Sequence, residues 1–108
     1  MEPGYQKAFR TFKKNIEKRF KEQVKKVVLF GSAARGEMTR ESDIDVLIVL
    51  DKVDDKIEKE ISNIAFDAGE SIRVIIVPII LSNKSYEDML NEKYPFIMNI
   101  EREGLAIA

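Results

Sequence analysis

The chain has 108 residues, of which 44% are hydrophobic and 34% charged, and its formal net charge at pH 7 is -1. This length supports one domain with a modest core, and the composition is that of a folded chain rather than a disordered one. The sequence contains no Cys and no His, which excludes disulfides, thiolate metal sites and imidazole catalysis. Any metal must therefore bind oxygen ligands, which favours Mg²⁺ or Mn²⁺.

Apolar runs and charge distribution indicate where the protein resides. No apolar run reaches the roughly 20 residues of a membrane span, and the charged N-terminus lacks the apolar core of a signal peptide. We therefore expect a cytoplasmic protein without a membrane contact.

Residues 1–28 carry nine Lys or Arg against three Glu. Two interpretations stay open, namely a solvated helix face and a surface for an acidic partner or nucleic acid, and the first is favoured.

The first half of the chain predicts a long helix and two strands, with a short helix between the strands. Val27–Phe30 and Val46–Leu50 are short aliphatic runs bounded by turn signals, as in strands buried on both faces. The second strand is expected to begin near Asp43 and to run to Leu50. Ser32 to Met38 fits a short helix with Ser32 at its N-cap. The preceding helix is indicated by apolar residues at steps of three and four, namely Tyr5, Phe9, Phe12, Ile16, Phe20 and Val24.

The second half predicts three helices, a third strand and a short edge strand. A helix from about Asp54 to Ala68 is expected to end at Gly69. Ile72 to Leu81 reads as a strand, and Pro78 within it argues for a sheet edge or a bulge. The remaining elements are a helix from Tyr86 to about Asn91 capped by Ser82 or Ser85, a helix from Phe96 to Glu103 with Pro95 in its first position and Gly104 after its end, and an edge strand at Leu105 to Ala108.

The resulting order of elements is α-β-β-α-β-α-α. It predicts an α/β or α+β two-layer domain, with helices packed on a small and mostly buried sheet. No repeat or linker divides the chain, so residues 1–108 are expected to form one domain.

Asp43 and Asp45 stand at the start of the second predicted strand. Because side chains alternate along a strand, both should lie on one face with their Cα atoms about 7 Å apart. An ionised carboxylate beside a core needs a partner or a metal. Ile44 and Val46 would then face the core on the other side, and the two carboxylates would form a cation site.

Gly31 and Ser32 end the first predicted strand. Glycine permits a sharp turn and close approach of a ligand to the backbone. Ser32 offers a hydroxyl and an unpaired N–H at an expected helix N-terminus, where phosphate binds well. A phosphate cradle beside a cation site is what a nucleoside triphosphate with Mg²⁺ requires.

These residues resemble a known family. Gly31-Ser32, ten residues and then Asp43-Ile44-Asp45 are similar to the signature of the DNA polymerase β-like nucleotidyltransferase superfamily. The fuller segments resemble its small branch, the minimal nucleotidyltransferases: Gly31-Ser32-Ala33-Ala34-Arg35-Gly36, Ser42-Asp43-Ile44-Asp45, Tyr94-Pro95-Phe96 and Arg102-Glu103-Gly104.

The resemblance implies a polymerase β palm-like fold with a small mixed sheet. It also implies roles for individual residues and a reaction. Asp43 and Asp45 would be the catalytic residues that hold Mg²⁺ or Mn²⁺. Gly31 and Ser32 would hold the β- and γ-phosphates of an NTP such as ATP. Arg35 would touch phosphate or orient the loop, or else form an ion pair with Glu37, Glu41 or Asp43. The reaction would transfer a nucleoside monophosphate from the NTP to a hydroxyl.

One feature departs from the family pattern. Active members usually carry a third carboxylate on the next strand, and residues 71–77 here contain no Asp or Glu. Asp67 and Glu70 are weak candidates to replace it, and Arg73 could instead pair with Asp43 or Asp45. Loss of a general base costs roughly 10² to 10⁴ in rate, so weak activity would remain.

Three functions compete. The favoured one is a Mg²⁺-dependent nucleotidyltransferase of EC 2.7.7 type. Since similar small proteins are often encoded beside a HEPN-domain toxin, its acceptor would be a partner protein, with this chain as the antitoxin of a toxin–antitoxin pair. The runner-up is an inactive module of the same fold that binds nucleotide or a partner. The third is a structural domain. A homodimer, through the N-terminal helix or residues 105–108, stays open.

Overall fold

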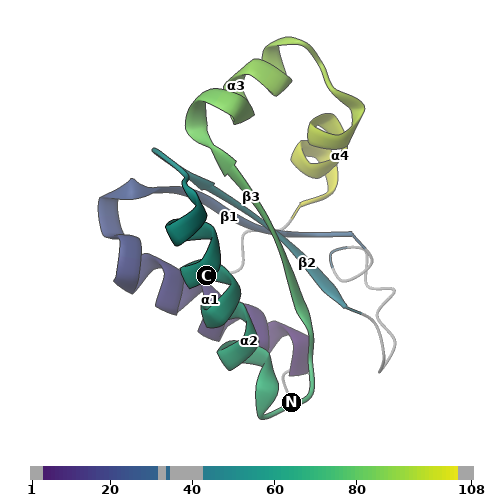
Figure 1. Ribbon diagram of the computed structural model, residues 1–108. Coiled ribbons are helices and arrows are strands. Elements are labelled where there is room, and N and C mark those ends of the chain that lie inside the picture. Colours follow the sequence, from purple (N-terminus) through teal and green to yellow (C-terminus); the bar gives the residue numbers. More distant parts are fainter. Residues whose placement is uncertain (1–3, 32–33, 35–42, 105–108) are drawn as a thin grey trace.

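The computed structural model describes residues 4–31, 34 and 43–104. The elements follow the predicted order: α1 (Gly4–Phe20), the 3-10 turn η1 (Lys21–Gln23), β1 (Val24–Phe30), β2 (Ile44–Leu50), α2 (Asp55–Glu70), β3 (Ile76–Ser82), α3 (Asn83–Asn91) and α4 (Pro95–Glu103). Figure 1 shows α1 and α2 together on one side of the strands and α3 and α4 on the other. The predicted mixed α+β class is confirmed.

The sheet has three strands in the order β1-β2-β3. β2 pairs antiparallel with β1 and parallel with β3, and α2 provides the crossover that a parallel pair requires. The central position of β2 explains why every residue from Val46 to Leu50 is buried. The sheet is therefore mixed, with its most apolar strand in the middle.

Pro78 lies on an edge strand, as predicted. The N–H of Ile44 donates to the carbonyl of Ile75 at 2.9 Å, and bonding groups alternate along a parallel strand. The backbone groups of Ile76, Pro78 and Ile80 therefore point away from β2. A proline, which has no N–H, costs no ladder hydrogen bond at that position.

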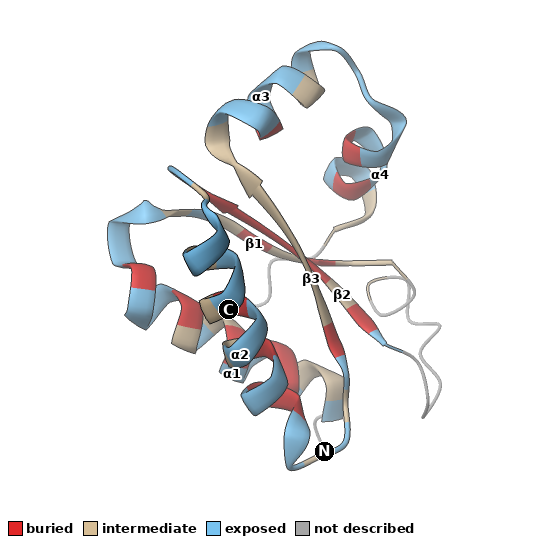
Figure 2. Ribbon diagram, viewed as in Figure 1, coloured by how far each residue is buried: buried red, intermediate tan, exposed pale blue. Residues whose placement is uncertain are grey.

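Two apolar layers enclose the sheet, one on each face (Figure 2). The larger layer packs the buried stripe of α1 and one face of α2 against one side of the strands. The smaller layer joins α3 and α4 to the other side through Leu47, Val49, Tyr86, Ile97 and Ile100. Alternate residues of β2 thus serve opposite layers, as a strand that is buried on both faces must.

Two strand boundaries differ from the prediction. β1 begins at Val24 instead of Val27, because η1 ends the helix and Lys21 adopts a φ of 51°. Val24 is therefore a strand residue and not part of the α1 stripe. β3 begins at Ile76 instead of Ile72, because Arg73 has a φ of 57° and the N–H of Val74 donates back to the carbonyl of Gly69.

Gly69 does not end its helix as predicted, because α2 continues to Glu70. The returning backbone explains the glycine instead. A Cβ at Gly69 would lie 1.9 Å from the carbonyl oxygen of Val74, so no larger residue fits between α2 and the approach to β3. This close contact fixes where β3 enters the sheet.

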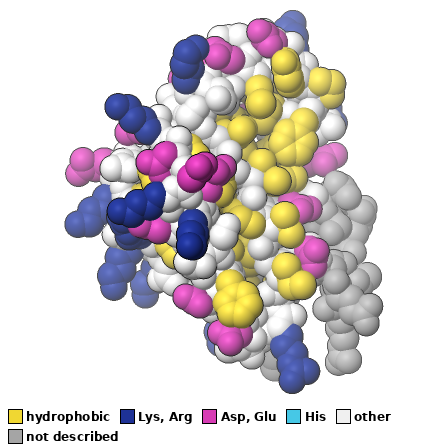
Figure 3. All heavy atoms as spheres, in the orientation of Figure 1, with side chains coloured by type: hydrophobic (Ala, Val, Ile, Leu, Met, Phe, Trp, Pro, Cys, Tyr) yellow, Lys and Arg dark blue, Asp and Glu magenta, His cyan; other side chains and the backbone are white. Residues whose placement is uncertain are grey.

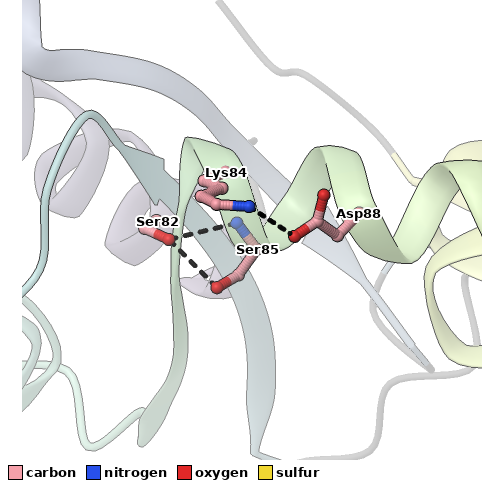
Figure 4. Close-up of polar contacts among 4 residues, drawn as sticks. All are labelled: Ser82, Lys84, Ser85 and Asp88. Atoms are coloured by element: carbon pink, nitrogen blue, oxygen red, sulfur yellow. Dashed lines mark hydrogen bonds and ion pairs between the residues drawn. The ribbon is translucent and has the colours of Figure 1, made fainter.

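Capping side chains, a proline and a glycine mark the ends of the helices. The carboxylate of Asp54 accepts from the N–H of Ile57 at 2.8 Å at the start of α2. Figure 4 shows Ser82 accepting from the N–H of Ser85, together with the Lys84–Asp88 ion pair of α3. Ser82, one of two predicted caps, is thus the N-cap, and α3 begins at Asn83 rather than Tyr86. Pro95 starts α4 and Gly104 follows its end, as predicted.

Some predictions fall on other parts of the chain. The expected short helix at 32–38 and the edge strand at 105–108 lie outside the described residues, apart from residue 34. Among the helices that the structure describes, none has the length and apolar character needed to span a membrane.

Candidate active site

The two predicted carboxylates lie where β2 begins. Asp43 directly precedes β2 and is exposed, while Asp45 is its second residue and is half-buried. Ile44 and Val46 are fully buried in the larger apolar layer, as predicted. Alternation therefore places Asp43 and Asp45 on the opposite face, in line with Leu47 and on the side that α3 and α4 cover.

Gly31 lies directly against Asp45. Phe30, the last residue of β1, is the register partner of Asp45, so the turn that follows β1 passes beside the carboxylate. A Cβ on Gly31 would lie 2.6 Å from Oδ2 of Asp45, and Gly31 has a φ of +75°. The positive φ favours glycine here, and the short distance brings the predicted phosphate turn next to the predicted metal ligand.

Electrostatics at Asp45 favour a cation. Burial raises the pKa of Asp45 above its ordinary value, and the neighbouring Asp43 raises it further. Ionised carboxylates so close together repel each other, and a divalent cation between them would relieve that repulsion. The donor set of two carboxylates at the edge of the core fits Mg²⁺ or Mn²⁺, both of which prefer oxygen.

The strand beside the carboxylates carries aliphatic side chains. Asp45 pairs with Val77 in the parallel register, and Ile75 lies one step earlier, level with Asp43. Ile75 is 64% exposed, which is unusual for isoleucine. Val77 on this strand and Ile75 just before it thus stand next to the carboxylates, where the resemblance implies a third carboxylate.

Other candidates do not complete the site. α2, which carries Asp67 and Glu70, packs its buried side on the far face of the sheet. Within residues 4–31, 34 and 43–104, no group of three acidic residues is arranged to hold a metal. Nor do the ion pairs of these residues join Arg73 to Asp43 or Asp45, so the alternative that Arg73 neutralises the pair is wrong for the described chain.

Ser32 and Arg35 lie outside the described residues. Their expected contacts with phosphate therefore stay predictions. Gly31, which precedes them, is placed where those predictions require it, beside the carboxylates.

The whole chain can now be compared with known proteins. A model of the nucleotidyltransferase domain family matches residues 9–102. The chain belongs to this family. The match spans the described site, from β1 through the Asp43 and Asp45 pair to α4. It confirms the resemblance to minimal nucleotidyltransferases.

Relatives extend the comparison. Two proteins of Methanocaldococcus jannaschii, both named as candidate protein adenylyltransferases, are 33% and 36% identical to this nucleotidyltransferase-family chain over 92% and 89% of its length, and over 93% and 91% of their own. A solved structure of a candidate nucleotidyltransferase from Sulfolobus solfataricus covers 82% of this chain and 81% of its own, with 22% identity and a TM-score of 0.44. The last is too distant to bear on the site.

A pocket beside Gly31 contains residues to which the sequence assigned no role. Phe30 and Gly31 form one wall, and Phe96, Asn99, Ile100 and Glu103 of α4 form the other. The Tyr94-Pro95-Phe96 and Arg102-Glu103-Gly104 segments resembled the family, and this was the only sequence signal that singled out α4. That α4 lies beside β1 follows only from the packing.

Proposed function

We propose that this protein is a Mg²⁺-dependent nucleotidyltransferase that moves a nucleoside monophosphate from an NTP, with ATP preferred, to a hydroxyl of an acceptor. The observation that carries this proposal is the contact of Gly31 with Asp45, next to Asp43, in a chain of the nucleotidyltransferase family. The pairing of Phe30 with Asp45 in the β1–β2 ladder keeps the phosphate turn beside the carboxylate pair.

The reaction is an in-line displacement. The acceptor oxygen forms a bond to the α-phosphorus of the NTP, the bond to the bridging oxygen breaks, pyrophosphate leaves, and the hydroxyl proton passes to solvent. Asp43 and Asp45 would hold Mg²⁺, which supplies charge neutralisation at the phosphates when bound. The backbone at Gly31 would orient the β- and γ-phosphates, with Ser32 and Arg35 as their further expected contacts.

Ile75 and Val77 bear on the rate. Neither side chain can accept the hydroxyl proton, so catalysis would depend on positioning and on charge neutralisation alone. The described residues also offer no third carboxylate at the carboxylate pair that could take this proton.

A protein is the favoured acceptor. The relatives that match over nine-tenths of their length are named as candidate protein adenylyltransferases. Within this proposal the acceptor is a HEPN-domain toxin, and the chain is the antitoxin of the pair. Figure 3 shows hydrophobic side chains gathered on the side of β3, α3 and α4, and Lys and Arg gathered towards α1 and α2. The apolar side, which also holds the carboxylates, suits a protein acceptor better than a nucleic acid.

Labelled ATP tests the transfer. The protein is incubated with Mg²⁺, a HEPN-domain protein as acceptor, and ATP labelled at either the α- or the γ-phosphate. Label from the α-position should appear on the acceptor, and label from the γ-position should not. An Asp43→Asn/Asp45→Asn double variant should transfer nothing. Asp51→Asn, which changes a carboxylate at the opposite end of β2, should transfer normally.

The runner-up is a binding module without chemistry, and the aliphatic Ile75 and Val77 favour it. Under that function the protein binds Mg·ATP and the acceptor remains unlabelled. Binding without transfer, with several acceptors tested, would replace the enzyme by the module.

A further inference from the structure

A pocket opens beside the carboxylate pair, between β1 and α4. Its volume is about 220 Å³. A cavity of ~150 Å³ is enough to hold benzene, so this pocket has room for a larger planar ring. It is lined by Phe30, Gly31, Phe96, Asn99, Ile100 and Glu103.

The pocket adjoins the candidate active site through Gly31. Gly31 touches the carboxylate of Asp45 and also lines the pocket. Phe30 pairs with Asp45 across the β1–β2 ladder. Because the pocket starts at Gly31, a nucleotide whose phosphates lie there can reach the aromatic wall of the pocket with its base.

The aromatic wall suits stacking with a base. The rings of Phe30 and Phe96 meet edge to face, with centroids 5.8 Å apart and planes at 90°. Phe96 is still 46% exposed, so one contact holds the ring while much of its surface remains available. Nucleic-acid bases stack on such rings regardless of sequence.

Polar groups on the same wall can read one edge of a base. Asn99 and Glu103 are four residues apart on α4, so their side chains are neighbours. Oδ1 of Asn99 accepts a hydrogen bond from Arg102 at 2.6 Å. The group that Asn99 still offers to a ligand is therefore the donor Nδ2. A carboxylate has several acceptor positions, so Glu103 can accept from an amino group in addition to its other contacts.

This pairing of a donor with an acceptor matches adenine. Adenine presents an exocyclic amino group, which donates, beside ring nitrogen N1, which accepts. Hypoxanthine, the base of ITP, presents an oxygen and an N1–H there, so both polarities are reversed. A site that offers a donor beside an acceptor pairs with the adenine pattern, whereas hypoxanthine would set donor against donor and acceptor against acceptor.

We propose that the pocket between β1 and α4 binds the adenine of ATP, with Phe96 stacking on the ring, Asn99 donating to N1 and Glu103 accepting from the amino group. The proposal rests on the proposed function, since it takes the phosphates to lie at Gly31. It assigns α4, outside the signature motif, the selection of the nucleotide.

Calorimetric titration with Mg²⁺ and three ligands tests this: ATP, ITP and inorganic tripolyphosphate, which has no base. Phe96→Ala should weaken ATP binding about tenfold or more and leave tripolyphosphate binding unchanged. Phe96→Tyr keeps a flat ring and should retain ATP binding. Glu103→Gln should remove most of the preference for ATP over ITP.

Matched controls lie on the same helix. Met98→Ala removes another exposed apolar side chain of α4, and Glu101→Gln changes a carboxylate that pairs with Lys26 away from the pocket. Both should bind all three ligands as the unaltered protein does. Unfolding curves of Phe96→Ala and Glu103→Gln should keep the same cooperativity, which separates loss of contact from loss of fold.

Two further outcomes separate this inference from the proposed function. If Phe96→Ala and Glu103→Gln bind ATP and ITP as the unaltered protein does, the pocket does not receive the base, and the proposed function stands. If the unaltered protein binds neither ATP nor tripolyphosphate with Mg²⁺, the proposed function and the pocket assignment both fail.

Discussion

Gly31 and Asp45 are in such close contact that a single added carbon on Gly31 would lie 2.6 Å from the Asp45 carboxylate. Gly31 directly follows β1 and Asp45 is the second residue of β2, so their contact depends on the register of the antiparallel pair. A one-residue slip would turn Asp45 into the apolar layer. The site is therefore a consequence of how the two strands pair.

Replacing Gly31 by Ala tests that contact. The φ of +75° is unfavourable for Ala, at a cost of about 1–2 kcal/mol, and the added carbon displaces the carboxylate. We expect Gly31→Ala to lower both the free energy of unfolding and the affinity for Mg·ATP. Gly4→Ala, where the nearest atom would be 4.0 Å away, should change neither; a Gly31→Ala protein with normal affinity would show that the contact is unimportant.

The raised pKa of Asp45 predicts a dependence of stability on pH. Because the folded state holds this proton more tightly than the unfolded chain, the contribution of Asp45 is complete below its ordinary pKa of 3.8 and is lost as pH rises through the raised value. The Asp45→Asn variant has no such carboxylate and so does not lose this contribution. Its free energy of unfolding, relative to that of the unaltered protein, should therefore rise between pH 3 and pH 7. Denaturant unfolding without divalent ions measures the difference.

Magnesium should reverse the effect at neutral pH. Millimolar Mg²⁺ should stabilise the unaltered protein, in which it relieves repulsion between Asp43 and Asp45, and leave Asp45→Asn unchanged. If the difference in free energy of unfolding between the unaltered protein and Asp45→Asn varies neither with pH nor with Mg²⁺, the two carboxylates do not interact.

Ile75 occupies the place of a third carboxylate, so Ile75→Asp should strengthen the metal site. The side chain is already 64% exposed, and the change should cost little stability. We expect tighter Mg²⁺ binding and, if the introduced carboxylate also accepts the hydroxyl proton, a rate increase of roughly 10² or more. Phe66→Asp introduces a carboxylate at another exposed apolar position. Equal Mg²⁺ affinity in both variants would argue against this place for the missing ligand.

Ser82 supports the helix that backs the site. Its hydroxyl caps α3 through the N–H of Ser85 (Figure 4), and loss of such a cap costs about 1 kcal/mol. Ser82→Ala should reduce the free energy of unfolding by about that amount. Ser85→Ala keeps the capped backbone N–H and should cost less. Urea denaturation of both variants makes the comparison, and equal losses would show that the cap is not the cause.

Local patterns in the sequence predicted the element order, the mixed class and the carboxylate pair. Asp43 and Asp45 could be placed because alternation along a strand is a local rule, and Ile44 and Val46 confirm it by their burial. Pro78 could be assigned to an edge because its missing N–H restricts where it can pair.

The remaining errors concern contacts between distant segments. Gly69 reads as the end of a helix, but the backbone of Val74 demands it for space. Arg73 reads as part of a strand, yet it occupies the turn that produces that contact. Likewise Phe96 and Glu103 meet Gly31 only because α4 packs beside β1, and no spacing within one segment encodes that arrangement.

The most direct test of the proposed site is calorimetric titration of ATP, with and without Mg²⁺, into the protein, into the Asp43→Asn/Asp45→Asn variant and into Asp51→Asn. We expect binding that requires Mg²⁺, is lost in the double variant and is unchanged in Asp51→Asn. No binding at millimolar ATP, with the double variant as stable as the unaltered protein or more so, would contradict it.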